Sequence, residues 1–228
     1  MKNNILLGNS EEILPALPDS FVDFVLTGPP YDKAKMAKGY SLDLHLIGEQ
    51  IKRVLKPNGV CVITLQDAFV KGGKSVTTFR TAVDWSEIML FWADYVYWRG
   101  ASKGGYWWDS RPRLEHDYVF VFVNGNKPKT YHKDIVDGSV LDYRFQTVGI
   151  KRPKEVSTPF PERLASDMIL TYTEPGDLVL DPFAGIGTTC RIAKLQDRNW
   201  LGIELIPSIR EFALNSVRKA VNGFRISR

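Results

Sequence analysis

One short loop of this chain, Gly28-Pro29-Pro30-Tyr31, combines residue types that suit the binding of a nucleobase. The two prolines fix φ and remove two backbone donors, so nearby carbonyl oxygens have fewer internal partners. An aromatic ring follows at once. Rigid carbonyl acceptors beside a ring suit an extruded base, because the ring can stack on the base while the carbonyls accept its amine hydrogens. The tetrapeptide alone leaves open a Pro-Pro turn beside a core tyrosine.

A second loop, from Asp181 to Thr189, reads Asp-Pro-Phe-Ala-Gly-Ile-Gly-Thr-Thr and lies between an expected strand and an expected helix. Glycines there let the backbone approach a ligand, and a helix N-terminus offers unpaired N–H groups. Glu204 ends the next expected strand, 17 residues beyond Gly187. In doubly wound folds such an acid accepts hydrogen bonds from ribose hydroxyls. The pattern predicts a nucleoside-bearing cofactor, with a tight ligand-free turn as the alternative.

Other ligands of glycine-rich turns fit this loop less well. A phosphate-binding loop has Lys after its last glycine, where Thr188 stands, and a dinucleotide fingerprint has Gly or Ala where Cys190 stands. Asp181 would repel a pyrophosphate but attract an amino group. S-adenosylmethionine has an amino group, a ribose and no phosphate, so it is the cofactor we predict.

Taken together, the two loops resemble those of the DNA amino-methyltransferases, whose hallmarks are an Asp/Asn/Ser-Pro-Pro-aromatic loop and an Asp-Pro-Phe-x-Gly-x-Gly-Thr turn. Here the catalytic loop precedes the cofactor turn, which is the circularly permuted order of the β group, and the similarity covers most of the chain. It implies a Rossmann-like methyltransferase sandwich that binds S-adenosylmethionine. The catalytic residues it implies are Gly28, Pro29, Pro30, Tyr31 and Asp32, and the cofactor-binding residues are Asn9, Phe160, Asp181, Pro182, Phe183, Gly185, Gly187, Thr188, Thr189 and Glu204.

Two of these assignments rest on local similarity beside the main motifs. Gly8-Asn9-Ser10 resembles the family segment whose acid contacts the cofactor adenine, with Asn9 in place of the acid. Residues 158–162 resemble the segment that helps enclose the methionine end of the cofactor. Both are expected to complete the cofactor site.

The first position of the catalytic loop departs from the family pattern. Gly28 stands where the family has Asp, Asn or Ser, whose side chain accepts a hydrogen bond from the target amine. Either backbone oxygens and a neighbour such as Asp32 suffice, or activity is reduced, or the residue is an inactivating substitution. A catalytically impaired DNA- or cofactor-binding protein is therefore an alternative function.

The reaction that the resemblance implies is direct methyl transfer to an exocyclic amine of a base flipped out of DNA, without a covalent enzyme intermediate. The target is cytosine N4 or adenine N6. Thr-Gly-Pro-Pro-Tyr resembles the Thr-Ser-Pro-Pro-Tyr loops associated with cytosine, which favours N4. A methyltransferase of RNA or of a small molecule stays open, and Cys190 and the Pro-Pro-Tyr loop disfavour a Rossmann oxidoreductase.

The expected partner is double-stranded DNA. The chain has a formal net charge of +4 and a pI of about 9.0, which fits a polyanion without establishing one. Cations near a flipped-base site would hold phosphates. A homodimer and a cognate restriction endonuclease are further candidate partners. The predicted DNA-binding residues are Lys33, Lys35, Lys38, Arg111, Arg113, Lys151 and Arg152.

These loops need a scaffold, and the alternation of short apolar runs with helix-period segments predicts one. The 228 residues suit a single α/β domain with a mostly parallel central sheet. Residues 99–114, which are rich in aromatics and cations, are expected to form a mobile loop that stacks on bases or is buried. Residues 124–157 are expected to lie outside the sheet as a target-recognition insertion. The expected strands are 5–7, 21–26, 60–65, 118–123, 178–180 and 200–203, and the expected helices are 10–17, 42–55, 164–172, about 186–195 and about 209–220.

The remaining composition places the chain in a reducing compartment. Cys61 and Cys190 both lie in apolar runs and are expected to be buried free thiols. No Cys/His cluster has the spacing of metal ligands, so no metal is predicted. No apolar run has the length of a membrane span, and the N-terminal run is too short for a signal peptide, so we expect a cytoplasmic protein.

Overall fold

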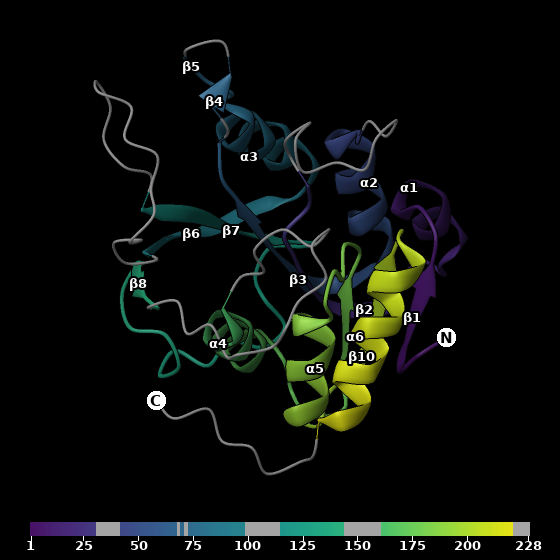
Figure 1. The fold of residues 1–228 in the computed structure, drawn as a ribbon. Helices are drawn as coiled ribbons and strands as arrows, with labels where there is room; N and C mark the ends of the chain where they lie inside the picture. The colour runs from purple at the N-terminus through teal and green to yellow at the C-terminus, as the bar shows by residue number, and fades with distance from the viewer. Residues whose placement is uncertain (31–41, 68, 71–72, 99–114, 144–160, 221–228) are drawn as a thin grey trace.

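The computed structural model describes residues 1–30, 42–67, 69–70, 73–98, 115–143 and 161–220. Its centre is one eight-stranded sheet in the order β1-β10-β9-β2-β3-β7-β6-β8, with a separate β4-β5 pair (Figure 1). The main strands are β1 (Asn4–Leu7), β2 (Val22–Thr27), β3 (Leu55–Leu65), β6 (Leu90–Trp98), β7 (His116–Val123), β8 (Val140–Asp142), β9 (Leu178–Asp181) and β10 (Asn199–Glu204), and the small pair is β4 (Phe69–Val70) with β5 (Gly73–Lys74).

The main sheet is parallel except at β7. The neighbours from β1 through β10, β9 and β2 to β3 pair in parallel, β7 pairs antiparallel with both β3 and β6, and β6 pairs in parallel with β8. Six residues of β2 and the last seven of β3 are buried throughout. Helices cover both faces of these strands, which explains why most of these buried residues are apolar. The predicted α/β fold with a mostly parallel sheet is confirmed.

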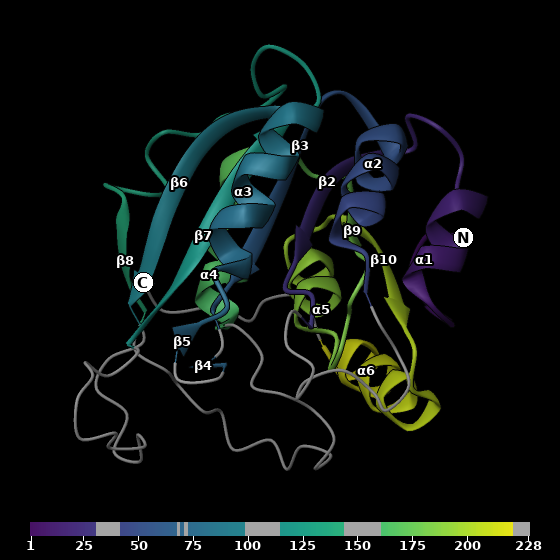
Figure 2. The ribbon, with the colours of Figure 1, turned by 90° about the horizontal axis from the view of Figure 1, so that it is seen from above.

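Two layers of helices enclose the sheet (Figure 2). On one face, Leu14, Ile51 and Trp85 pack with Val25 and Phe122; the helices there are α1 (Ser10–Ile13), the 3-10 turn η1 (Leu14–Ala16), α2 (Leu44–Val54) and α3 (Thr77–Ile88). On the other face, Met168, Ile192 and Val217 pack with Phe24 and Val62. That layer consists of α4 (Glu162–Tyr172), α5 (Thr188–Leu195) and α6 (Pro207–Lys219).

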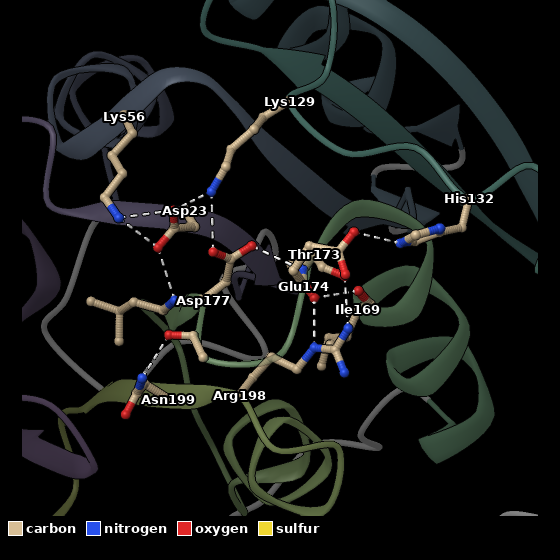
Figure 3. Close-up of polar contacts among 12 residues, drawn as sticks. Asp23, Lys56, Lys129, His132, Ile169, Thr173, Glu174, Asp177, Arg198 and Asn199 are labelled. Carbon is tan, nitrogen blue, oxygen red and sulfur yellow. Dashed lines mark hydrogen bonds and ion pairs between the residues drawn. The ribbon is translucent and has the colours of Figure 1, made fainter.

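A polar network closes the edge of the sheet at which the parallel strands begin (Figure 3). Buried Asp23, near the start of β2, accepts hydrogen bonds from Leu178 N at 2.9 Å and from Lys56 Nζ at 2.8 Å. Lys129 Nζ lies 3.4 Å from Asp23 Oδ1 and 3.2 Å from Asp177 Oδ1. His132 donates its backbone N–H to Thr171 O at 2.9 Å. Lys129 and His132, which follow β7, therefore hold this part of the chain at the edge where the parallel strands begin, opposite their carboxyl ends.

Several sequence expectations change in detail. Strand β3 begins at Leu55, five residues before the predicted start. Elements α3 and β6 lie where the sequence pattern indicated none. Residues 124–157 were expected wholly outside the sheet, but Val140–Asp142 form strand β8 against β6. The segment 99–114 lies outside the described residues. No helix in the described ranges has the length and apolarity needed to cross a membrane.

Candidate active site

Four neighbouring parallel strands end at one edge of the sheet, and their ends bring together those predicted site residues that the structure describes. Strand β2 ends at Thr27, next to Gly28; β9 ends at Asp181, and β10 ends at Glu204. Strand β1 leads into Gly8 and Asn9, and Gly8 N donates to Glu204 O at 3.0 Å. In open α/β sheets, ligands bind outside the carboxyl ends of the strands. The fold therefore joins two loops that are more than 150 residues apart in the sequence.

Asp181 holds this edge together from inside. Its Oδ1 accepts hydrogen bonds from Thr27 Oγ1 at 2.8 Å and from Phe183 N at 3.0 Å, and its Oδ2 accepts one from Thr189 Oγ1 at 2.7 Å. The side chain is 2% exposed. Burial raises the pKa of Asp181 to about 6, against the effect of these three donors. Its carboxylate points into the protein toward these three donors, and a direct contact between Asp181 and a cofactor amine stays a prediction.

Glu204, unlike Asp181, is partly exposed, and its carboxylate lies beside Gly185 of the cofactor turn. Its Oε2 accepts from Gly185 N at 2.9 Å and its Oε1 accepts from Ile206 N at 2.9 Å. Burial raises the pKa of Glu204, and the two backbone N–H groups oppose that rise. A carboxylate has about four acceptor positions, and this one is partly exposed, so it keeps the capacity to accept from a further donor such as a ribose hydroxyl.

Three glycines in or beside the cofactor turn differ in the space that a side chain would have. A Cβ at Gly202 of β10 would lie 2.9 Å from Ala184 Cβ and 3.0 Å from Cys190 Sγ, so the turn packs directly on the strand. Gly187 has φ +81° and a Cβ there would lie 3.1 Å from Ala213 Cβ. At Gly185, with φ +52°, the nearest atom to a Cβ would be Phe183 O at 3.9 Å. Space beside Gly185 therefore lies open next to the Glu204 carboxylate.

Helix α5 begins directly after this turn. Its N-cap is Gly187, which has no side chain to cap the first N–H groups of Thr188 and Thr189. Pro182 O accepts a hydrogen bond from Ser10 Oγ, which joins the turn to α1. An open glycine turn, a helix N-terminus and a held carboxylate fit the ribose and methionine parts of S-adenosylmethionine.

Asn9 combines a structural role with its place at the site. It is the N-cap of α1, and its Oδ1 accepts from Glu11 N at 3.1 Å. Its Nδ2 lies 3.4 Å from Glu11 Oε2. The side chain that was predicted to meet the adenine is therefore oriented by the first turn of α1, one strand away from Glu204.

The catalytic loop is described as far as Pro30. Pro29 is buried, and Gly28 and Pro30 are partly exposed at the end of β2. Several predicted site residues lie outside the described residues. They are Tyr31, Asp32, Lys33, Lys35, Lys38, Arg111, Arg113, Lys151, Arg152 and Phe160.

Sequence reasoning missed two residues of this edge, Thr27 and Ser10. Both are buried hydroxyls beside a recognised motif, and each contacts the cofactor turn. A polar residue directly after the apolar run Phe24-Val25-Leu26 was the available signal for Thr27. The described part of the chain contains no cluster of His, Cys, Asp and Glu that could hold a metal ion, and Cys61 and Cys190 are buried free thiols.

Comparison with known proteins agrees with this geometry. Residues 22–215 match the model of the N6/N4 DNA methylase family. The orphan methyltransferase M.BamHII of Bacillus amyloliquefaciens is 28% identical over 82% of this chain and 85% of its own. The type II methyltransferase M.HpaI of Haemophilus parainfluenzae is 26% identical over 98% of this chain and 77% of its own.

Solved structures share the fold. The PvuII DNA methyltransferase, which is cytosine-N4-specific, superposes with a TM-score of 0.79 at 23% identity and covers 96% of this chain and 86% of its own. The M1.HpyAVI–SAM complex gives a TM-score of 0.71 at 21% identity, over 93% of this chain and 98% of its own. With the family model spanning most of the sequence and the cofactor turn beside the Pro-Pro loop, the chain belongs to the DNA methylase family and is an S-adenosylmethionine-dependent DNA methyltransferase.

Proposed function

We propose that this protein transfers a methyl group to N4 of a cytosine flipped out of double-stranded DNA. The observation that carries the proposal is the adjacency of Gly28-Pro29-Pro30, the Asp181 turn and Glu204 at the ends of three neighbouring strands. The fold of the cytosine-N4-specific PvuII enzyme supports cytosine as the target, as does the Thr27-Gly28-Pro29-Pro30 sequence. Adenine N6 is the alternative within the same chemistry.

In this proposal the protein mainly supplies orientation and electrostatics. Bound S-adenosylmethionine supplies the electrophilic methyl group. Glu204 and Asn9 hold the nucleoside end, and the turn at residues 185–187 and Phe160 hold the methionine end. Tyr31 stacks on the extruded base. Carbonyl oxygens at Gly28 and Pro29 accept hydrogen bonds from the target amine. These bonds reduce delocalisation of the nitrogen lone pair into the ring, and Asp32 is a neighbouring acceptor.

Incorporation of a labelled methyl group into defined polymers tests this activity. The purified protein would be incubated with tritiated S-adenosylmethionine and with duplex DNA, single-stranded DNA or RNA. We expect label in duplex DNA, and we expect Glu204→Gln to weaken cofactor binding because an amide group replaces one acceptor oxygen. Label confined to RNA, or cofactor binding with no transfer to any polymer, would overturn the proposal. The latter outcome would favour the impaired binding protein that Gly28 left open.

We also propose a restriction–modification setting, in which the methylation protects DNA from a cognate endonuclease. The relative M.HpaI is a type II methyltransferase, whereas M.BamHII is an orphan enzyme. Challenge of modified plasmid DNA with a panel of endonucleases would identify the protected site. Sedimentation of the purified protein, with and without DNA, would test the homodimer.

A further inference from the structure

The sheet loses its backbone pairing between β2 and β9 just where the active site begins. The register between these strands runs from Phe24–Val179 to Val25–Leu180. Thr27 and Asp181, the last residues of the two strands, lie beyond it. A side-chain hydrogen bond joins them instead, with Thr27 Oγ1 2.8 Å from Asp181 Oδ1. One hydroxyl therefore connects the strand that carries the Pro-Pro loop to the strand that carries the cofactor turn.

Two further hydroxyls hold the same strand end. Thr189 Oγ1, in the first turn of α5, lies 2.7 Å from Asp181 Oδ2 and 3.3 Å from Leu26 O. A hydroxyl has one proton to donate, and the shorter contact assigns it to the carboxylate. Thr64 Oγ1 of β3 lies 3.4 Å from Thr27 O. Strand β2 thus ends among side chains from β3, β9 and α5.

Burial increases the free-energy cost of losing the Thr27–Asp181 hydrogen bond. Thr27 and Asp181 are both enclosed, as is Thr189. Hydrogen bonds to a charged group are about twice as strong as neutral ones, and a buried acceptor that loses its donor is costly. Small displacements between reacting groups reduce rates strongly. Removal of this donor should therefore shift the Pro-Pro loop relative to the cofactor turn.

We propose that Thr27 is a positioning residue of the methyl transfer, which acts through Asp181 to set the spacing between the base-side loop and the cofactor turn. The inference rests on the proposed function, since the spacing matters for rate only where base and cofactor react. It assigns Thr27 no contact with either substrate. Its effect should accordingly appear in the rate of transfer and not in DNA affinity.

Substitutions at position 27 test this inference. Thr27→Val keeps the shape and removes the donor, Thr27→Ser keeps the donor, and Thr27→Cys offers a weak donor. At saturating S-adenosylmethionine we expect kcat of Thr27→Val to fall about tenfold to a hundredfold, with Thr27→Ser within about threefold of the parent and Thr27→Cys between them. The Kd for DNA, measured by anisotropy with S-adenosylhomocysteine bound, should stay unchanged.

The matched control is Thr81→Val in α3, which removes another buried hydroxyl, one that donates to Thr77 O within the same helix at 2.9 Å. Normal kcat in Thr27→Val, or an equal loss of kcat in Thr27→Ser or Thr81→Val, would overturn the inference. If the parent protein transfers no methyl group to DNA, the proposed function fails instead. Calorimetry then tests the contact separately, with an expected weakening of S-adenosylmethionine binding by about threefold to tenfold in Thr27→Val alone.

Discussion

Asp181 belongs to the cofactor motif, but its contacts in the structure are with other residues that form the site. The motif identified it as a cofactor residue, and the structure surrounds its carboxylate with Thr27, Phe183 and Thr189. Its charge in turn contributes to raising the pKa of Glu204 on β10 and of Cys190 on α5, although burial is the larger cause for both groups. This burial gives Asp181 a measurable signature in the pH dependence of stability.

We predict that Asp181→Asn becomes more stable relative to the parent protein as pH rises from 4 to 6. The pKa of Asp181 in the folded protein is about 6, above its ordinary value of 3.8. Its contribution to stability is therefore complete below about pH 4 and diminishes as pH rises through about 6. Denaturant unfolding should show the difference growing by roughly 1.4 kcal/mol per pH unit and levelling off above about pH 6. A difference that is flat with pH would contradict the assignment, and the exposed Asp137→Asn serves as the matched carboxylate-to-amide control.

Gly28 gives a second prediction at this scale. Gly28→Ser should maintain kcat or raise it by up to about tenfold, because a hydroxyl adds an acceptor for the target amine. Gly28 is not among the described residues with positive φ, so no left-handed backbone conformation disfavours a side chain there. Steady-state kinetics would be compared with Gly28→Ala, which adds the Cβ alone. Loss of transfer in the serine variant with intact cofactor binding would remove the role assigned to this position.

At the scale of elements, the two ends of the sheet have separate tasks. The carboxyl ends of β2, β9 and β10 form the site, whereas the amino ends are closed by Asp23 and its lysines. Burial alone would raise the pKa of Asp23, but the N–H of Leu178 together with Lys56 and Lys129 lowers it below its ordinary value. Since the folded-state pKa is lowered, Asp23 stabilises the fold above its unfolded pKa, and this stabilisation disappears as pH falls through the folded value.

We predict that Asp23→Asn lowers the free energy of unfolding by about 1–3 kcal/mol at neutral pH while leaving kcat unchanged at low temperature. The reason is that a buried acceptor of two lysines and a backbone N–H loses its charge at the edge opposite the site. Asp19→Asn is the matched control, because Asp19 pairs with Arg53 but is 76% exposed. Equal stability losses in the two variants, or a selective loss of kcat in Asp23→Asn, would show that the ends of the sheet are not separated in this way.

Much of this arrangement could be predicted from the sequence, and the exceptions have physical causes. Strands β2, β3 and β9 lie between two helix layers, and each contains a short apolar run, at residues 24–26, 60–63 and 178–180, which made them recognisable. Strand β6 begins with the exposed residues Leu90, Phe91 and Trp92, and β8 has three residues, so neither gave a clear period. The inward orientation of Asp181 depends on Thr27, 154 residues away, which no local pattern contains.

For the whole molecule, the path of the chain after β7 indicates which part of residues 124–157 lies near the site edge of the sheet. Residues 124–135 begin at the amino edge of the sheet, fastened by Lys129 and His132. The β8 strand then runs parallel to β6, back toward the edge that carries the site. We therefore propose that, within residues 124–157, those that follow β8 recognise the target sequence. We also propose that Lys33, Lys35 and Lys38, which follow the catalytic loop in the sequence, bind DNA phosphates.

Salt dependence tests the placement of these cations. Replacement of Lys33 and Lys35 by glutamine should weaken DNA binding and reduce the slope of log K against log salt concentration by about 0.9 for each phosphate that is no longer neutralised. Replacement of Lys127 and Lys133, in the segment at the amino edge, should leave the slope as it is. An unchanged slope in the first variant, or an equal reduction in the second, would remove the assignment.

The identity of the methylated nucleoside tests the central claim most directly. Duplex DNA would be modified with S-adenosylmethionine that carries a deuterated methyl group, digested to nucleosides and analysed by mass spectrometry. We expect deuterated N4-methyldeoxycytidine, in amounts that grow with enzyme concentration and that fall in Glu204→Gln at limiting cofactor. Label found only in N6-methyldeoxyadenosine would contradict the choice of cytosine, and DNA without label would contradict the assignment of this site to base methylation.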